Sequence, residues 1–255
     1  MHADHTSKLA DWVPMPRYLL RCWVVKKIIR SLRPRDFIEI GAATGDIAHW
    51  MSQQRMTGTA VEISPAALEM LRARLAGNSA VQIFSQDSSH LKAEADLLLS
   101  MEVLEHIEDD RSALANWYDL IRPGGHLLLS VPAHQRLFSA EDEMAGHFRR
   151  YEKQELADKL AAVGFEQPEI LSYGFPLGIL LKRLRTFVAA RRLHSDRRSR
   201  EQRTAASGVE RKRFLPLRWL LNNVFFYPFN AIQMPFLKLD WSDGYIAVAR
   251  KPEAI

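Results

Sequence analysis

Residues 37–48, FIEIGAATGDIA, decide the fold of this chain. The apolar run that ends at Ile40 is typical of a buried strand, and Gly41 and Gly45 are typical of a tight turn that leads into a helix. Small residues in such a turn let the backbone come close to another group. That group is a pyrophosphate, another nucleoside-bearing cofactor or the next helix, and the rest of the sequence has to decide between them.

Segments with strand and helix patterns alternate along the chain. Apolar runs predict seven strands, at 36–41, 58–64, 80–87, 95–102, 126–132, 169–176 and 245–251. Helical patterns are found at 46–54, 65–76, 110–121 and 153–165. This alternation predicts an α/β fold in which helices cover both faces of a mostly parallel sheet.

The turn at 41–46 does not suit a phosphate. A dinucleotide-binding turn needs glycine at its first, third and sixth positions, which here hold Gly41, Ala43 and Asp46. A carboxylate at the sixth position would face the charge of the pyrophosphate, and the Gly-Lys-Ser/Thr of a Walker loop is missing. A different spacing is filled, with Glu39 two residues before Gly41 and small residues at Ala43 and Gly45.

This second spacing resembles motif I of the class I S-adenosylmethionine-dependent methyltransferases, in particular their ubiquinone-pathway-like group (types 11 and 12). The resemblance implies S-adenosylmethionine as the cofactor, with its amino-acid end beside this loop. It also implies a Rossmann-like, doubly wound, seven-stranded sheet whose last strand is antiparallel. Ala43 replaces the central glycine of the motif, which is tolerable if its φ angle is negative.

Residues after the following strands extend the predicted cofactor site. Glu62 ends the second strand, 21 residues after Gly41, where an acid can bind both ribose hydroxyls. The resemblance implies that Ile63 lies against the adenine and that Asp87 accepts from its exocyclic amine. The other implied cofactor residues are Ser88, Ser100, Met101 and Glu102. Each acid alone could be a helix cap, but together they lie at the carboxyl ends of successive strands, where open α/β sheets bind ligands.

The acceptor side is expected after the fourth and fifth strands. Residues 140–156, AEDEMAGHFRRYEKQEL, resemble a D-E-x-x-G-H-x-R-R-Y stretch of bacterial methyltransferases. Histidine ordinarily changes charge near neutral pH, so His147 and His106 are the predicted catalytic bases, with a helix cap as the alternative for His106. The predicted acceptor-binding residues are Asp142, Arg149 and Tyr151. Alternatively, Asp142 and the arginines form a structural ion-pair cluster, which is the favoured reading for Arg150 and Tyr151. We assign no metal ligands.

The sequence divides into four parts. They are an N-terminal helical segment (1–35), a methyltransferase core (36–176), a helical insertion (177–241) and the final strand of the core (242–255). From Lys182 to Arg218 there are 13 Lys or Arg against 3 acids, although the whole chain carries only +5. The insertion therefore predicts either an acceptor lid or a surface that meets anionic lipid headgroups; the alternative is a pair of packed helices with a solvated basic face. Nucleic acid is disfavoured, because the aromatic residues cluster away from the arginines.

The remaining features of the sequence limit where the protein can be located and which activity it can have. Cys22 is the single cysteine, the N-terminus lacks a secretory pattern, and no long apolar run is present. We expect a cytoplasmic protein, peripheral at the inner membrane face. The expected activity is S-adenosylmethionine-dependent methylation of a small, hydrophobic or lipid-like acceptor, with oxygen as the favoured atom. The alternatives are methylation of an anionic glycan or nucleotide-linked sugar, and a non-catalytic binding protein built on this fold.

Overall fold

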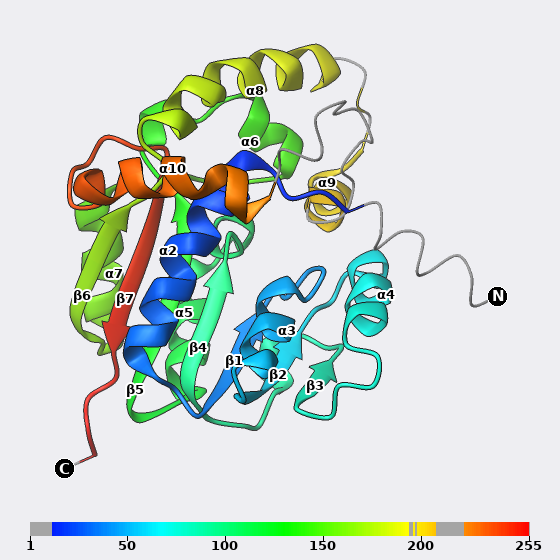
Figure 1. Cartoon of the computed structure of the whole chain (residues 1–255), viewed down its shortest axis with the longest axis vertical. Coiled ribbons are helices and arrows are strands. Elements are labelled where there is room, and N and C mark those ends of the chain that lie inside the picture. The colour runs from blue at the N-terminus through cyan, green and yellow to red at the C-terminus, as the bar shows by residue number, and fades with distance from the viewer. Residues whose placement is uncertain (1–11, 194–195, 197, 208–221, 255) are drawn as a thin grey trace.

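A seven-stranded sheet forms the centre of the computed structural model, which describes residues 12–193, 196, 198–207 and 222–254 (Figure 1). Its strands are β1 (Asp36–Ile40), β2 (Thr57–Val61), β3 (Val81–Phe84), β4 (Ala95–Met101), β5 (Ile121–Pro132), β6 (Glu166–Ser172) and β7 (Gly244–Arg250). Their order is β3-β2-β1-β4-β5-β7-β6. β7 is antiparallel to β5 and to β6, and the other neighbours are parallel. The predicted Rossmann-like fold, with its antiparallel last strand, is confirmed.

Helices connect the strands and follow them. They are α2 (Pro16–Leu32), α3 (Asp46–Gln53), α4 (Pro65–Arg74), α5 (Asp110–Asp119), α6 (Ala140–Ala145), α7 (Lys153–Val163), α8 (Leu177–Leu193), α9 (Arg200–Ser207) and α10 (Asn223–Gln233). Short 3₁₀ turns are η1 (Ser88–His90), η2 (Leu104–His106), η3 (Gln135–Leu137) and η5 (Met234–Phe236). Pro65 begins α4 because proline fits the first helical turn, and Gly164 ends α7 in the left-handed conformation at φ +113°.

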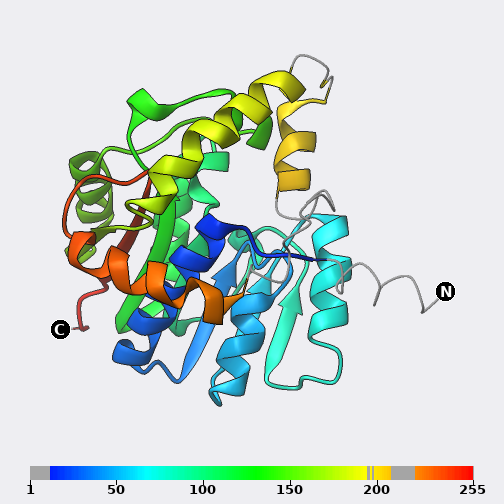
Figure 2. The ribbon, with the colours of Figure 1, turned by 45° about the horizontal axis from the view of Figure 1, so that its top comes forward.

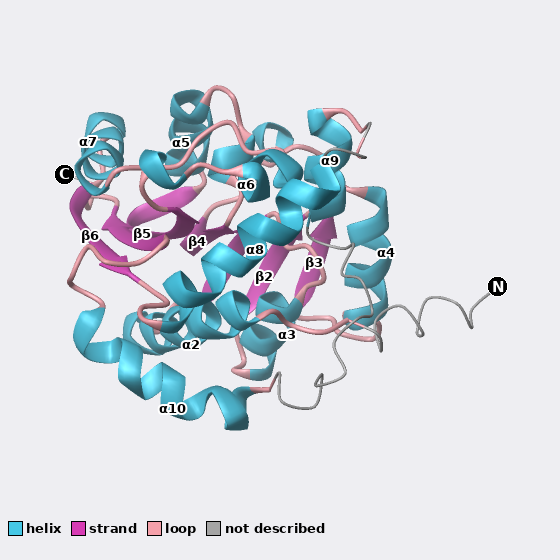
Figure 3. Ribbon diagram, turned by 90° about the horizontal axis from the view of Figure 1, so that it is seen from above, coloured by secondary structure: helices cyan, strands magenta, loops and turns pink. Residues whose placement is uncertain are grey.

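Two hydrophobic clusters, one on each face of the sheet, make the core. One cluster joins the sheet to α2, α3 and α4, and it includes the buried thiol of Cys22. The other joins it to α5 and α7, with Trp117 and Leu160 fully buried. Seen from above, α2 and α3 lie on one side of the sheet and α5 and α7 on the other (Figure 3).

Several strand boundaries differ from the sequence prediction by three residues or more. β2 ends at Val61 instead of residue 64, and β6 spans Glu166–Ser172 instead of 169–176. β5 begins at Ile121 instead of residue 126, and a bulge shifts the register between the pairs Ala95–Ile121 and Leu97–His126. Pro123 and Gly124 lie within this irregular stretch, so these turn residues mark a bulge and not a loop. β3 ends at Phe84 instead of residue 87.

Helices α8, α9 and α10 lie between β6 and β7 in the chain and pack outside the sheet. α8 and α9 contact α6 near the carboxyl ends of the parallel strands, and α10 packs against α2 (Figures 1 and 2). Part of the predicted basic segment, residues 208–221, lies outside the described residues. Among the helices that are described, none combines the length and the apolar character needed to cross a bilayer.

Candidate active site

The loops that follow β1, β2 and β4 meet at the carboxyl edge of the sheet. Gly41 has φ +69°, and a Cβ atom there would clash with Val103 of the loop after β4. Gly45 has φ +72°, and a Cβ atom there would clash with Leu71 of α4. Glycine is therefore required at both positions, first to turn the chain and second to let the neighbouring side chain approach.

Ala43 departs from the expectation made for it. Its φ angle is +48°, in the left-handed region, whereas the sequence analysis required a negative angle for alanine to be tolerated. A residue with a Cβ atom costs about 1 kcal/mol or more in this conformation. The turn thus keeps the backbone shape that the glycine motif favours, and the alanine carries the strain.

Glu62 fixes the turn to the end of β2. Its Oε2 accepts from the Ala43 backbone N–H (2.8 Å), and its Oε1 accepts from the N–H groups of Ile63 (2.9 Å) and Ser64 (2.8 Å). A carboxylate offers about four acceptor positions, so one remains for a ligand. Ile63 beside it exposes 63% of its surface, as an apolar platform would.

Two buried polar atoms near the turn lack a hydrogen-bond partner among the described residues: Oε2 of Glu39 and Oγ of Ser100. Burial, together with the charges of Asp46 and Glu62, raises the pKa of Glu39 to about 8. Unsatisfied buried polar atoms are rare in native proteins and call for an explanation. Here they lie at the ends of β1 and β4, where both residues are predicted to line a cofactor.

Glu102 is held by arginines that the sequence analysis missed. It has φ +60°, pairs with Arg17, and its Oε1 lies 3.4 Å from Nη1 of Arg21 and 3.1 Å from the hydroxyl of Tyr173. Burial alone would raise the pKa of Glu102, but the two guanidinium groups lower it to about 2. Arg17 and Arg21 are four residues apart on α2, so they share a face. The spacing of the two arginines is visible in the sequence, but nothing in the sequence around Arg17 links it to Glu102, which is 85 positions away.

Asp87 and Ser88 make structural contacts. Asp87 is exposed and its Oδ1 accepts from the Ser89 N–H (2.9 Å) at the start of η1. Ser88 donates its hydroxyl to Asn116 (3.1 Å). The Asp87 contact is the helix cap that was given as the alternative for each acid, and the predicted cofactor contacts of Asp87 and Ser88 remain predictions. Met101 is 8% exposed and ends β4 beside Glu102.

The two predicted catalytic histidines lie together. Their rings are 4.7 Å apart, edge to face. Nδ1 of His147 hydrogen-bonds to Oδ1 of the fully buried Asp142 (2.9 Å), and Nε2 of His147 lies 3.8 Å from Oε1 of Glu105. Nδ1 of His106 lies 3.2 Å from the hydroxyl of Thr204. The structure thus brings His106, His147 and Asp142 to one place.

The electrostatics of this pair are set by burial. Burial and the neighbouring His147 lower the pKa of His106 to about 3, so His106 is neutral. Burial and the charge of Glu102 raise the pKa of Glu105 well above its usual range, so Glu105 holds a proton. Glu105, His106 and His147 each place a ligand atom within 4.8 Å of the others, a group that could hold a metal ion. No metal ligands were predicted there, because His147 lies 42 and 41 positions after Glu105 and His106 in the chain.

Two predicted acceptor-binding residues have structural partners instead. Tyr151 is fully buried and donates its hydroxyl to Asp110 (3.0 Å). Arg149 pairs with the same Asp110 (2.9 Å) and donates to the backbone oxygen of Glu108 (2.6 Å). Their contacts do not bring them to Glu62 or Glu102, and do not support a role in binding the acceptor. Asp142 binds Nε of Arg150 (2.8 Å), as the ion-pair alternative stated.

Helix α9 spans the same edge. The Ser64 hydroxyl donates to the Ala205 backbone oxygen (3.2 Å), Thr204 contacts His106, and Arg203 donates to the Glu143 oxygen (3.1 Å). α9 thus reaches from the end of β2 to the histidine pair. By contrast, two surface depressions of about 290 and 300 Å³ lie at the opposite edge of the sheet, and neither is lined by a predicted site residue.

A family model described as a methyltransferase domain matches residues 15–172, which include the turn, the acids after the strands and the histidine pair. The chain belongs to the class I S-adenosylmethionine-dependent methyltransferases. The methyltransferase therefore has the predicted family and the predicted cofactor, S-adenosylmethionine.

Relatives and solved structures agree with this assignment. The methyltransferase is 30% identical over 146 residues to a mitochondrial ubiquinone biosynthesis O-methyltransferase of Schizosaccharomyces pombe, covering 50% of this chain and 53% of that one. It is 27% identical over 117 residues to a protein of the same name from Alkalilimnicola ehrlichii, covering 44% and 47%. The chain spans about half the length of the curated relatives it matches.

The fold is shared with solved structures at low identity. The N-methyltransferase NodS of Bradyrhizobium japonicum, bound to S-adenosylhomocysteine, has a TM-score of 0.54 at 17% identity, covering 92% of this chain and 88% of that one. Phosphoethanolamine N-methyltransferase 2 of Haemonchus contortus, bound to S-adenosylmethionine, has a TM-score of 0.55 at 16% identity, covering 86% and 49%.

Proposed function

We propose that this methyltransferase transfers a methyl group from S-adenosylmethionine to a hydroxyl oxygen of a small, largely apolar acceptor. The names of the curated relatives, which are O-methyltransferases, support the choice of oxygen. The observation that supports it most is the pair formed by Asp142 and His147 at the edge of the sheet, because a hydroxyl is a weak nucleophile that needs a base.

The residues at the carboxyl edge suit the proposed cofactor. S-adenosylmethionine supplies an electrophilic methyl group on a sulfonium, and it also carries an ammonium and a carboxylate. Glu39 offers an unpartnered oxygen for a cation, and Arg21, whose charge acts on Glu39, offers a guanidinium for a carboxylate. Glu62 keeps one acceptor position for the ribose, and Ile63 offers an apolar surface for the adenine.

His147 is the proposed general base. Asp142 accepts from Nδ1 of His147 and thereby fixes its tautomer, which leaves Nε2 to take a proton from the acceptor hydroxyl. The charge of Arg150 and the hydrogen bond from His147 outweigh burial and hold the pKa of Asp142 well below its usual range, so Asp142 stays ionised. His106 remains neutral beside it and helps to exclude water.

The test uses two variants and two measurements. Calorimetry with S-adenosylhomocysteine measures cofactor binding, and mass spectrometry of extracts incubated with a labelled methyl donor identifies a methylated acceptor. His147→Gln should lower turnover of that acceptor by ~100-fold or more, with the S-adenosylhomocysteine affinity unchanged. Turnover equal to that of the wild type would remove His147 as the base, and no cofactor binding by the wild type would leave a non-catalytic role for the fold.

The outer surface of α8 and α10 supports a second proposal, that the protein attaches to an anionic lipid surface. Leu180, Leu184 and Phe187 of α8 expose 72%, 60% and 54% of their surfaces, and their spacing puts them on one face of the helix. Val224 and Tyr227 of α10 expose 85% and 65%. Exposed apolar helix faces with nearby arginines suit a membrane interface.

Flotation with anionic and with neutral vesicles tests this attachment. Phe187→Asp should weaken binding to the anionic vesicles, because it puts a charge where an apolar ring would enter the lipid. Gln54→Asp adds the same charge at an exposed residue that ends α3, away from α8 and α10, and should bind as the wild type does. Equal binding by both variants, or none by the wild type, would contradict the attachment.

A further inference from the structure

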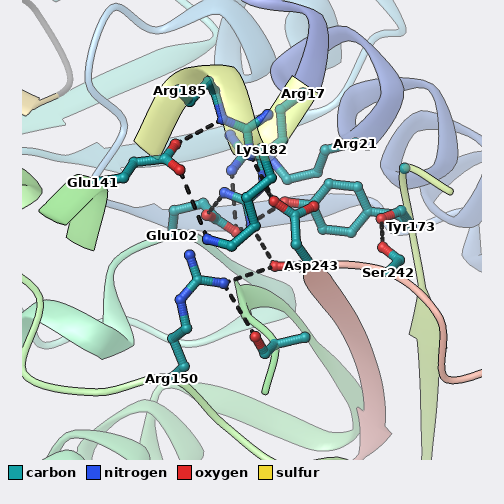
Figure 4. Close-up of polar contacts among 12 residues, drawn as sticks. Arg17, Arg21, Glu102, Glu141, Arg150, Tyr173, Lys182, Arg185, Ser242 and Asp243 are labelled. Carbon is teal, nitrogen blue, oxygen red and sulfur yellow. Dashed lines mark hydrogen bonds and ion pairs between the residues drawn. The ribbon is translucent and has the colours of Figure 1, made fainter. Parts of the chain in front are cut away.

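A cluster of charged side chains lies between α2, α6 and α8 beside the end of β4 (Figure 4). We call it the charged cluster. Its members are Arg17, Arg21, Glu102, Glu141, Asp142, Arg150, Lys182, Arg185 and Asp243. None of the four cations that α2 and α8 contribute was predicted to bind the acceptor, and Figure 4 shows them gathered around the carboxylates of the cluster.

Three guanidinium groups of the cluster, those of Arg17, Arg150 and Arg185, are already paired at hydrogen-bond distance. Arg185 of α8 lies 2.7 Å from Oε1 of Glu141 and 2.6 Å from Oδ2 of Asp243. Arg150 pairs with Asp142, and Arg17 pairs with Glu102. These arginines therefore hold the cluster together, and a ligand gains little by replacing their partners.

Lys182 differs from the arginines. It is 8% exposed, and its Nζ has no hydrogen-bond partner among the described residues. The nearest carboxylate oxygen, Oε2 of Glu141, is 3.8 Å away and also lacks a partner. A buried ammonium without hydrogen bonds is costly, so the part of the chain that the structure describes leaves this amine free to bind another group.

The orientation of α8 makes this placement more unusual. The apolar side chains of Leu180, Leu184 and Phe187 are exposed, whereas Lys182 points into the protein. A soluble helix ordinarily turns its apolar stripe inward and its charges outward. Here the inward side of α8 carries the charges, which brings Lys182 within reach of the charge of Asp142, the partner of His147.

The charges in the cluster do not balance. Counted by formal charge, five cations (Arg17, Arg21, Arg150, Lys182 and Arg185) meet four carboxylates (Glu102, Glu141, Asp142 and Asp243), which leaves one positive charge in excess. Burial, and the charge of Arg150, lower the pKa of Lys182, in keeping with an amine whose charge is poorly compensated. The cofactor, which has two cationic groups and one carboxylate, would add a further positive charge.

We propose that Lys182 binds an oxyanion, a carboxylate or a phosphate, carried by the methyl acceptor. This inference rests on the proposed function, because it takes the acceptor to lie at the carboxyl edge beside His147. It makes the acceptor an amphipathic molecule: an apolar body with one anionic group, held by Lys182 while the hydroxyl faces the base.

Nuclear magnetic resonance of the full-length protein, saturated with S-adenosylhomocysteine, provides the test. The probes are 4-fluorobenzoate and inorganic phosphate, and 4-fluorobenzyl alcohol is the neutral counterpart of the benzoate. The wild type should bind at least one anion, and bind 4-fluorobenzoate more tightly than the alcohol if the oxyanion is a carboxylate. Lys182→Met should weaken anion binding ~10-fold or more, as expected for a lost charged hydrogen bond.

Two further variants complete the design. Arg183→Met removes a cation from the neighbouring, exposed position of α8 and should leave anion binding within about twofold of the wild type. Lys182→Arg keeps the charge and should retain most of the binding, which guards against a folding defect in Lys182→Met. Tighter binding of 4-fluorobenzoate would indicate a carboxylate on the acceptor, and tighter binding of inorganic phosphate would indicate a phosphate.

The result that overturns the inference is specific. Wild-type protein that binds S-adenosylhomocysteine but neither anion at up to ~20 mM, or Lys182→Met that binds them as the wild type does, would exclude Lys182 as the anchor and leave the proposed function standing. Wild-type protein that fails to bind S-adenosylhomocysteine would overturn both.

Discussion

Glu62 has two roles, and replacing it should reveal both. Its carboxylate accepts three backbone hydrogen bonds that tie the turn after β1 to the end of β2, and it is the proposed ribose ligand. Glu62→Ala should weaken S-adenosylhomocysteine binding by ~1.5–3 kcal/mol, or ~10- to 100-fold, because a charged hydrogen-bond acceptor is lost. Calorimetry measures the affinity, and urea unfolding measures the accompanying loss of stability.

Asp87→Ala is the matched control for this prediction. Asp87 also follows a strand, but its side chain caps η1 and is exposed. If it only caps, the affinity for S-adenosylhomocysteine should stay near that of the wild type. A loss as large as that of Glu62→Ala would instead support the adenine contact that the sequence resemblance implied. An unchanged affinity in Glu62→Ala would exclude the ribose contact.

Glu39 should make the protein less stable as the pH rises. Its pKa is about 8 in the native state against 4.5 as the reference value, so the native state binds more protons than the unfolded state between these values. Stability conferred by the protonated carboxyl is then present at low pH and is lost as the pH rises through this window. Glu39→Gln cannot titrate at this position. The unfolding free energy of Glu39→Gln minus that of the wild type should therefore increase by up to ~1.4 kcal/mol for each unit by which the pH rises.

Urea unfolding of both proteins from about pH 5 to about pH 8 checks the sign. Other titrating groups are common to the two proteins, so they cancel in the difference. A difference that stays constant over this range would mean that Glu39 is ionised in the native state.

Single residues could be predicted where the chemistry was local. Glu39, Gly41, Gly45 and Glu62 lie within or next to strand ends, so their placement at one edge followed from the alternation of strands and helices. Lys182 could not be predicted in the same way, because its place depends on which face of α8 turns inward. That choice is made by packing against α6 and not by the pattern of the helix itself.

Among the elements, α9 is the one whose position should depend on a single glycine. Gly146 ends α6 with φ +84°, and a Cβ atom there would lie 2.5 Å from Oγ1 of Thr204 and 2.8 Å from the backbone oxygen of Arg200. Gly146→Ala should therefore push α9 away from α6 and from His106. We expect faster dissociation of S-adenosylhomocysteine, by ~10-fold, because α9 also contacts Ser64 beside Glu62.

Gly77→Ala separates this displacement from backbone strain. Gly77 has a similar angle, φ +75°, but open space where its Cβ atom would lie. Both variants should lose about 1 kcal/mol of stability from the left-handed conformation, whereas stopped-flow measurements should show faster dissociation only in Gly146→Ala. Equal dissociation rates in the two variants would mean that α9 does not retain the ligand.

The elements themselves followed from sequence better than their ends did. Proline at the start of α4 and glycine at the end of α7 fixed those helices, and the apolar runs located all seven strands. The start of β5 was misjudged because Pro123 and Gly124 are residues typical of a turn, whereas pairing with β4 extends the strand across them as a bulge. Tertiary pairing overrides local turn chemistry there.

At the scale of the whole molecule, the parallel strands direct their carboxyl ends toward α6, α8 and α9, which lie together at one end of the sheet (Figure 1). Every residue proposed to bind the cofactor or the acceptor comes from that end or from the start of α2. The depressions at the other end, lined in part by Arg35 and Asp96, carry no proposed role. Only the carboxyl edge of the sheet is therefore expected to bind a ligand.

Amide hydrogen exchange with and without S-adenosylhomocysteine tests this division over the whole chain. Exchange should slow at 41–45, 62–64 and 100–103, because the loops after β1, β2 and β4 are proposed to enclose the ligand, and also in α9, which contacts Ser64 and His106. Residues 32–35 and 94–96 at the opposite edge should exchange as before. Glu62→Ala, at the same total ligand concentration, should lose most of the added protection. Protection confined to 32–35 and 94–96 would instead place the ligand at the amino ends of the strands and would contradict every site residue proposed for this methyltransferase.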